Sequence, residues 1–211
     1  MRLISIILFI MLTLPSLGQS RMRDFWKTMP DSLLPYLSRD IRFEMNDKYD
    51  IGQRATGPTS FGDSAVITAL NDRYIDVSLS SAVRIQMRLL HLGNGKPLIC
   101  VARTYGNDRG ETRVSFYDAG WNLKAVFCTD SPCKYIKTIP PLTHRPDSMT
   151  EDRYAELLTF IDPRMVIAEL SPIDDSLTMR LSMPVVGKGE ENEMKSILLQ
   201  RKLNWTGKRF N

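Results

Sequence analysis

The stretch RYIDVSLSSAVRIQMRLLHLGNGKPLICVARTY, residues 73–105, decides the fold. Apolar and polar side chains alternate along its first two runs, and a period of two places one kind on each face of a strand. Gly93-Asn94-Gly95 is a strong hairpin signal, because tight turns need residues that tolerate a positive φ. The stretch therefore predicts consecutive antiparallel strands with one buried face and one face in solvent.

The same pattern continues on both sides of this stretch. Turn signals at 106–110 and 118–120 separate short apolar runs, and residues 97–105 have so few polar side chains that they form a candidate central strand. The predicted strands are 64–71, 73–80, 83–92, 97–105, 111–117, 121–127, 165–171, 176–183 and 194–205.

Two amphipathic helices are predicted beside these strands. The first spans 31–49, with Asp31 as N-cap. A short turn followed by a main helix that begins at Pro35 is the alternative, since proline lacks an N–H and suits a first turn. The second spans 150–161, capped by Thr150 and ended by Pro163. In the first helix, apolar residues recur every four positions on one face: Leu33, Leu37, Ile41, Met45 and Tyr49.

The order of these elements is helix plus meander, then a shorter helix plus meander. Strands joined by hairpins, without regular alternation with helices, indicate an α+β fold. We predict an antiparallel meander sheet, or sheets, covered by the two helices. The domain is 19–211, and two α-plus-meander lobes, 24–138 and 148–206, are the alternative organisation.

The N-terminus predicts export. Residues 1–18 carry one charge, Arg2, before a run of about a dozen apolar residues that Pro15 closes, followed by small residues suited to signal peptidase. Cleavage is expected after Gly18, with Ser20 as the alternative. A membrane anchor would need about 20 apolar residues, and no cysteine lies near the cut for lipid attachment. The mature chain is therefore expected in the periplasm or secreted, without a transmembrane segment.

Composition and charge argue against nucleic acid as a partner. Apolar residues make up 43% of the chain and charged residues 25%, which is ordinary for a globular protein. The net charge is +4, and loss of Arg2 with the leader lowers it further. So mild a charge on an exported chain does not favour phosphate-backbone binding.

Cys128 and Cys133 flank the short segment TDSP, and in an exported chain this spacing predicts a disulfide that fastens a hairpin. The spacing is not the CxxC of redox sites. A zinc site would need further ligands, and His91 and His144 are the only histidines. Cys100 lies in an apolar run and is expected to be a buried thiol.

Signatures of catalysis are missing from the sequence. There is no GxSxG, HExxH or SxxK motif and no phosphate-binding glycine loop. Asp118 with Asp130, and Asp174 with Asp175, could act as paired carboxylates or calcium ligands. Each lies where a turn is expected, and aspartate is common in turns for local reasons. We therefore predict no catalytic residue, no metal ligand and no cofactor.

Arginine and aromatic side chains on the polar faces of the strands form a candidate binding surface. Such residues are the usual anchors of recognition, and an acidic or carbohydrate-like partner would suit them. The alternative is an ordinary solvent face. The residues of this predicted surface are Arg84, Arg88, Arg103, Arg113 and Trp121.

Three segments resemble a known family. MPDSLLPYLSRDIRFEMNDKY (29–49), LLHL with PLICVARTY (89–105) and RVSFYDAGWNL (113–123) are similar to an uncharacterised family of exported Bacteroidales proteins, domain of unknown function 3256. The resemblance runs from about Phe25 to Trp205. It implies a Gram-negative envelope location and supplies no activity, cofactor or catalytic residue.

The sequence leaves three functions open. The first is a non-enzymatic binding module that contacts an envelope component or small ligand through its sheet. The second is a hydrolase that uses carboxylates at strand ends. The third is a carrier of an apolar ligand, with a cavity lined by residues such as Ile85, Met87 and Leu89.

Overall fold

The computed structural model describes residues 21–106, 109–129 and 131–211. The predicted signal peptide, 1–18, lies outside these residues. Within them, no helix has the length and apolar character needed to cross a membrane.

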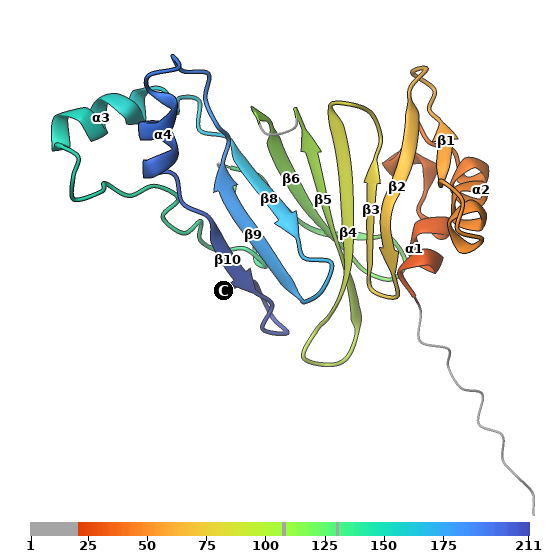
Figure 1. Cartoon of the computed structure of the whole chain (residues 1–211). Coiled ribbons are helices and arrows are strands. Elements are labelled where there is room, and N and C mark those ends of the chain that lie inside the picture. Colours follow the sequence, from red (N-terminus) through yellow and green to blue (C-terminus); the bar gives the residue numbers. More distant parts are fainter. Residues whose placement is uncertain (1–20, 107–108, 130) are drawn as a thin grey trace, which may run out of the picture.

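The fold is α+β, with two antiparallel sheets (Figure 1). Its helices are α1 (Met22–Thr28), the 3₁₀ helix η1 (Asp31–Leu33), α2 (Arg39–Asp50), α3 (Glu151–Thr159) and α4 (Glu191–Ile197). The larger sheet holds β1 (Thr56–Pro58), β2 (Ser64–Asn71), β3 (Tyr74–Ser78), β4 (Val83–His91), β5 (Pro97–Tyr105), β6 (Glu111–Tyr117) and β7 (Leu123–Phe127). The smaller sheet holds β8 (Val166–Leu170), β9 (Ser176–Leu181) and β10 (Arg201–Asn204).

The larger sheet is a meander in which each strand pairs with the next along the chain, from β1 to β7. The predicted hairpin between β4 and β5 is confirmed: Leu92 donates its N–H to the carbonyl of Lys96, and Gly95 has a φ of 77°. This turn pairs His91 with Pro97 and thereby fixes the register of both strands.

One face of the larger sheet packs against the N-terminal helices. Phe25 and Trp26 of α1 are buried with apolar residues of β2 to β5 in a single cluster. Arg42 of α2 is fully buried and donates hydrogen bonds to the carbonyls of Leu37 and Met29, so it fastens the chain that joins α1 to α2.

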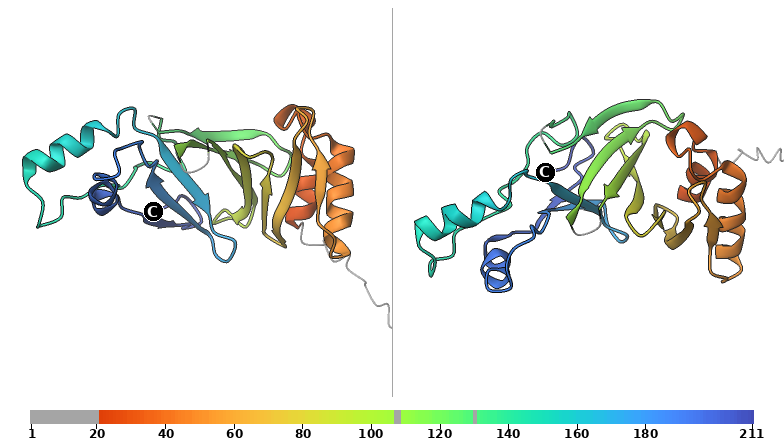
Figure 2. Two further views of the ribbon diagram at one scale, coloured as in Figure 1. Left: turned by 45° about the horizontal axis from the view of Figure 1, so that its top comes forward. Right: turned by 90° about the horizontal axis from the view of Figure 1, so that it is seen from above.

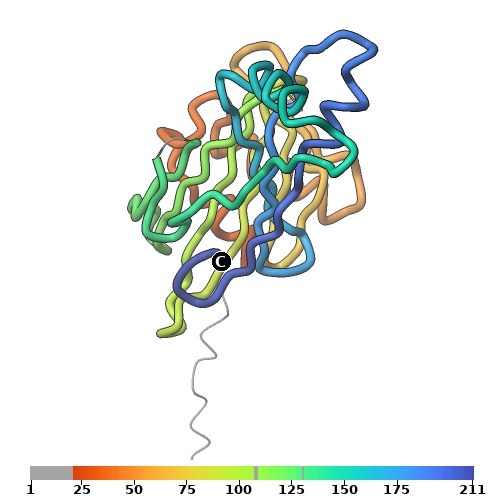
Figure 3. Tube along the Cα trace, turned by 90° about the vertical axis from the view of Figure 1, so that its left-hand side faces the viewer, coloured from red at the N-terminus to blue at the C-terminus, as the bar shows by residue number. Residues whose placement is uncertain are grey.

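The opposite face packs against the smaller sheet, whose order is β10-β9-β8. Residues of β5 and β6 share a buried cluster with β8 and β9, and Tyr135, Leu142 and the penultimate residue Phe210 complete it. Figure 2 shows the smaller sheet lying against the larger one, and Figure 3 shows the chain end close to the β4–β5 hairpin. A hydrogen bond from the Gly93 N–H to the Gly207 carbonyl joins these two segments.

Helix α3 does not take the position predicted for it. Thr150 caps it as expected, accepting from the Arg153 N–H, but Leu157 is its one buried residue among those described. That residue packs with Met194 and Ile197 of α4 in a separate small cluster. The two helices lie at the end of the molecule opposite α1 and α2 (Figure 1). The smaller sheet, and not α3, covers the second face of the larger sheet.

Two predicted elements need correction. The helix predicted from Asp31 or from Pro35 begins at Arg39, because residues 34–38, which include Pro35, form a turn after the short helix η1. The predicted last strand, 194–205, is helical in its first part: Met194 and Ile197 are buried three residues apart, which is helical spacing, and acidic residues occupy the first turn of α4. Helix α1 and strand β1 were not predicted, since each is a short segment without a periodic pattern.

Candidate functional site

The arginines of the predicted surface lie on opposite faces of the larger sheet. In the β4–β5 ladder Arg84 pairs with Thr104, whereas Arg103 pairs with Ile85. Residues directly opposite each other share a face. Arg84 and Arg88 therefore face the smaller sheet, and Arg103 faces the side of the N-terminal helices.

Arg84 links three strands on the face toward the smaller sheet. Its guanidinium donates to both carboxylate oxygens of Asp76, at 2.9 and 2.6 Å, and to Glu169 of β8 at 3.0 Å. Beside it, Gln86 donates to the Tyr74 hydroxyl at 2.7 Å and accepts the N–H of Leu170. Burial raises the pKa of Tyr74, so its phenol stays neutral among these contacts between the two sheets.

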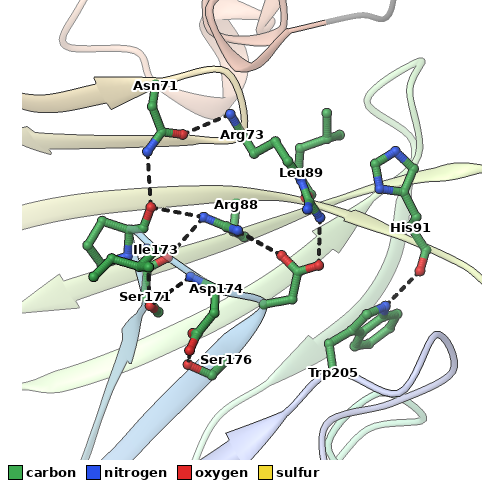
Figure 4. Close-up of polar contacts among 12 residues, drawn as sticks. Asn71, Arg73, Arg88, Leu89, His91, Ser171, Ile173, Asp174, Ser176 and Trp205 are labelled. Atoms are coloured by element: carbon green, nitrogen blue, oxygen red, sulfur yellow. Dashed lines mark hydrogen bonds and ion pairs between the residues drawn. The ribbon is translucent and has the colours of Figure 1, made fainter.

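Arg88 anchors the hairpin between β8 and β9. Its side chain is 4% exposed and donates to the Asp175 carboxylate at 2.9 Å and to the carbonyls of Ser171 and Pro172 at 3.2 Å. Arg73 reaches the other oxygen of Asp175 at 2.6 Å. Figure 4 shows the Arg88 side chain beside Ser171 of this hairpin. These contacts satisfy Arg88 within the protein, so it is a structural residue and not part of an open binding surface.

On the other face, Arg103 and Arg113 stand directly opposite each other in the β5–β6 ladder. Arg103 donates to the Leu33 carbonyl at 2.6 Å, while its Nε is buried without a partner. Arg113 is exposed, and within residues 21–106, 109–129 and 131–211 it has no hydrogen bond or ion pair. Like charges directly opposite each other destabilise a sheet. Within the part of the chain that the structure describes, this arginine pair therefore has no carboxylate bonded to either guanidinium group.

The arginine pair lies in a groove made of two adjoining hollows of about 510 and 210 Å³. The hollows share Ser32, Leu33, Arg103 and Tyr105, so they form one continuous surface. We call this surface the arginine groove. Burial raises the pKa of Tyr36, which lines its larger hollow.

The walls of the arginine groove come from segments far apart in the sequence. Tyr36 and Phe61, whose ring centroids are 5.7 Å apart, line the larger hollow between the loop before α2 and the β1–β2 loop. The smaller hollow crosses β5, β6 and β7, and Arg113, Tyr117 and Leu123 line it. No sequence pattern predicted that Tyr36 and Phe61 would line a groove. Phe61 carries one signal that could have found it: a large aromatic in a turn-forming segment, TSFGDS, where no core is expected.

Trp121 is a packed residue beside the groove. Its ring lies 5.5 Å from that of Tyr117, its φ is 62°, and its Nε1 is buried without a partner. It lines neither of the two hollows. Of the five predicted surface residues, the structure thus brings only Arg103 and Arg113 together in an open site.

The candidate acids are engaged by their neighbours. Hydrogen bonds from Lys124, Asn122 and Gly120 lower the pKa of Asp118 to about 2. Asp174 accepts from Lys202 and Ser176, which lowers its pKa as well. In the described part of the chain, no group of three or more His, Cys, Asp or Glu side chains is placed to hold a metal ion. Asp130, the predicted partner of Asp118, lies outside the described residues.

Neither His91 nor His144 has a hydrogen bond or ion pair to a carboxylate of the described residues. The carbonyl of His91 accepts the indole N–H of Trp205 at 2.7 Å (Figure 4). His144 is exposed, and its N–H pairs with the Ile197 carbonyl. Among the described residues, each acid named for the hydrolase alternative already pairs with a lysine or an arginine: Asp118 with Lys124, Asp174 with Lys202, and Asp175 with Arg73 and Arg88.

The predicted disulfide is not formed. Cys100, Cys128 and Cys133 are free thiols. The physical reason is that the two turn cysteines begin separate tight turns: Cys128 bridges to Ser131, and Cys133 bridges to Ile136. Burial raises the pKa of Cys100, which is fully enclosed and stays a neutral thiol.

The residues named for an apolar-ligand cavity lie in a filled core. Ile85, Met87 and Leu89 are between 0% and 3% exposed and belong to the cluster that Phe25 and Trp26 of α1 fill. They line neither hollow of the arginine groove. The carrier alternative thus loses the residues on which it depended.

A family model described as "Protein of unknown function (DUF3256)" matches residues 15–210. The chain belongs to this family. A solved structure, of a domain of an uncharacterized protein from Porphyromonas gingivalis W83, matches with a TM-score of 0.66 and 21% sequence identity, covering 88% of this chain and 95% of that one. The match shows that the two share a fold. No curated protein matches the chain.

Proposed function

We propose that this DUF3256 chain is an exported, non-enzymatic binding module, and that the arginine groove holds an anionic group of its ligand. The observation that carries the proposal is the cross-strand pair of Arg103 and Arg113, which has no acidic partner among the described residues. An anion bound between the two guanidinium groups would relieve their repulsion. Paired guanidinium forks also match carboxylate and phosphate oxygens.

Export is supported by the leader-like residues 1–18, with one charge, a short apolar run and a small-residue cut site. The mature chain would then begin at Gln19 or Arg21, immediately before α1. Fractionation of the native host, with the N-terminus determined by mass spectrometry, tests this part. A full-length chain that starts at Met1 in the cytoplasm would refute it.

Anion binding is tested by titrating the isotope-labelled mature chain with phenylacetate and, separately, with inorganic phosphate, while amide shifts are followed by NMR. We expect saturable shifts at β5, β6 and the loop before α2, and their loss in Arg113→Gln. The matched control is Arg164→Gln, another exposed arginine with no partner in the described ranges and no place in the groove.

Arg113→Gln should fold at least as well as the wild type, because it removes a like charge from a directly opposed pair. Lost binding in this variant can therefore be separated from lost structure. Shifts that persist in Arg113→Gln, or that disappear equally in Arg164→Gln, would contradict the proposed role of the groove.

A further inference from the structure

The arginine groove has a distribution of charge that narrows the class of its ligand. Arg103 lines both hollows and Arg113 the smaller one, whereas Asp63, in the β1–β2 loop, lines only the larger one. The Asp63 carboxylate is exposed and without a hydrogen bond or ion pair to the described residues. A polyanion such as nucleic acid would meet this negative group, so the surface favours a ligand with one anionic group and not a chain of them.

Apolar side chains lie on both sides of the arginine pair. Phe61, Leu79 and Val83 line the larger hollow, and Leu123 and Val126 line the smaller one. The combined surface is in the size range of ligand pockets, about 300–1,000 Å³, and is far larger than a single small anion requires. The ligand should therefore carry apolar groups next to its anionic group.

The groove is open along its length, which argues against a lipid tail. Phe61 is 80% exposed and Leu123 is 55% exposed, so both ends of the surface face water. Small apolar ligands are usually enclosed over about 70–90% of their surface. An acyl chain here would stay largely hydrated, whereas a peptide can turn its polar backbone to the open side and its side chains to the sheet.

Polar groups suited to a peptide backbone also lie in the groove. Ser32 is exposed at the junction of the two hollows, and Ser115 lies on the floor of the smaller one. Neither hydroxyl has a hydrogen-bond partner within the described residues, so each is available to a backbone carbonyl or N–H.

We infer that the arginine groove binds an extended peptide segment of a partner protein, with an aspartate or glutamate between the two arginines and an aromatic or large apolar residue beside it. This inference rests on the proposed function, since it names the ligand of the same groove. The carboxylate is held by Arg103 and Arg113, and the neighbouring apolar side chain packs against Tyr36 and Phe61. Arginine and aromatic residues are the usual anchors of such contacts.

The test is selection of a random twelve-residue peptide library, displayed on phage, against the mature chain. We expect enriched sequences with an acidic residue within two positions of an aromatic one. A fluorescein-labelled peptide of the enriched sequence should bind Arg113→Gln about tenfold more weakly or worse, as for loss of a charge-assisted hydrogen bond. Replacing its acidic residue by the matching amide should cause a similar loss, and Arg164→Gln should bind like the wild type.

Enriched peptides without an acid, or peptides that bind Arg113→Gln as well as the wild type, would overturn the inference. Flotation with phosphatidylglycerol vesicles provides a second arm: vesicle binding that depends on Arg113, without peptide binding, would assign the groove to a lipid surface and overturn it too. Saturable phenylacetate shifts with no acid-dependent peptide would refute the peptide ligand and leave the anion groove standing. Failure of both would remove the groove as a binding site.

Discussion

Replacing Asp175 by asparagine should destabilise the packing of the two sheets. Asp175 is the carboxylate between Arg73 and Arg88, and the Arg88 side chain is only 4% exposed. The substitution keeps the size of the side chain but removes its negative charge. The guanidinium of Arg88 then has only neutral acceptors, two backbone carbonyls and the new amide oxygen, and no counter-ion at the boundary between the sheets.

The expected loss follows from these contacts. Breaking a fully buried ion pair by removing one partner costs about 3–5 kcal/mol. The Asp175 side chain is 28% exposed, so water screens part of the charge, and Arg88 keeps its carbonyl partners. We therefore expect a decrease of about 2–3 kcal/mol in the free energy of unfolding, which corresponds to about 5–10 °C in Tm for a chain of this size.

The assay is urea unfolding at pH 7, followed by circular dichroism, with Asp174→Asn as the control. Asp174 is the adjacent residue and also forms an ion pair, but its partner Lys202 is 53% exposed. An exposed pair contributes little, so this variant should stay close to the wild type. Equal midpoints for the two variants would refute the argument that Arg88 needs its counter-ion.

Three further predictions test other parts of the structure. Gly57→Ala should lower the free energy of unfolding by about 1–3 kcal/mol, because a Cβ there would lie 2.3 Å from Ile41 of α2; unchanged urea unfolding would contradict this close approach. Asp118→Asn should lower stability near pH 7 by removing the ion pair with Lys124. The folded pKa of about 2 is depressed from 3.8, so this contribution is present above about pH 4 and disappears as the pH falls through about 2. The free energies of unfolding of the variant and the wild type should therefore become equal as the pH falls. A difference that stays constant with pH would argue against the ion pair. Titration of the unreduced protein with a thiol reagent in denaturant should count three thiols. Cys100 should react only after unfolding. A count of one would show that Cys128 and Cys133 form the disulfide after all.

Much of the fold follows from local pattern. The alternation along β3 and β4 and the Gly-Asn-Gly turn predict the strands, the hairpin and the buried face, because a two-residue period needs no knowledge of distant contacts. Helix α4 was missed because residues 191–197 are a short polar segment, and its buried face exists only where α3 packs on it. Its stability comes from tertiary contact and not from propensity.

The site was predictable only in part. Once the hairpin turn is assigned, the register places Arg84 and Arg103 on opposite faces, so this split could have been derived from the sequence. Which face of the larger sheet is covered could not be derived from the sequence, because the smaller sheet comes from residues 166–204, far along the chain. Tyr36 and Phe61 line the arginine groove only because the loop before α2 packs against the β1–β2 loop. No local sequence pattern predicts this contact.

The central meander has its two faces closed by segments on either side of it in the sequence, α1 and α2 before it and β8 and β9 after it. Strands β1 to β7 follow one another directly along the chain, so they can pair through contacts of short sequence separation, whereas the second face is covered only when residues 166–181 pack onto it. A chain cut before β8 should therefore keep paired strands but expose a wide apolar surface, and it should aggregate more readily than the uncut chain.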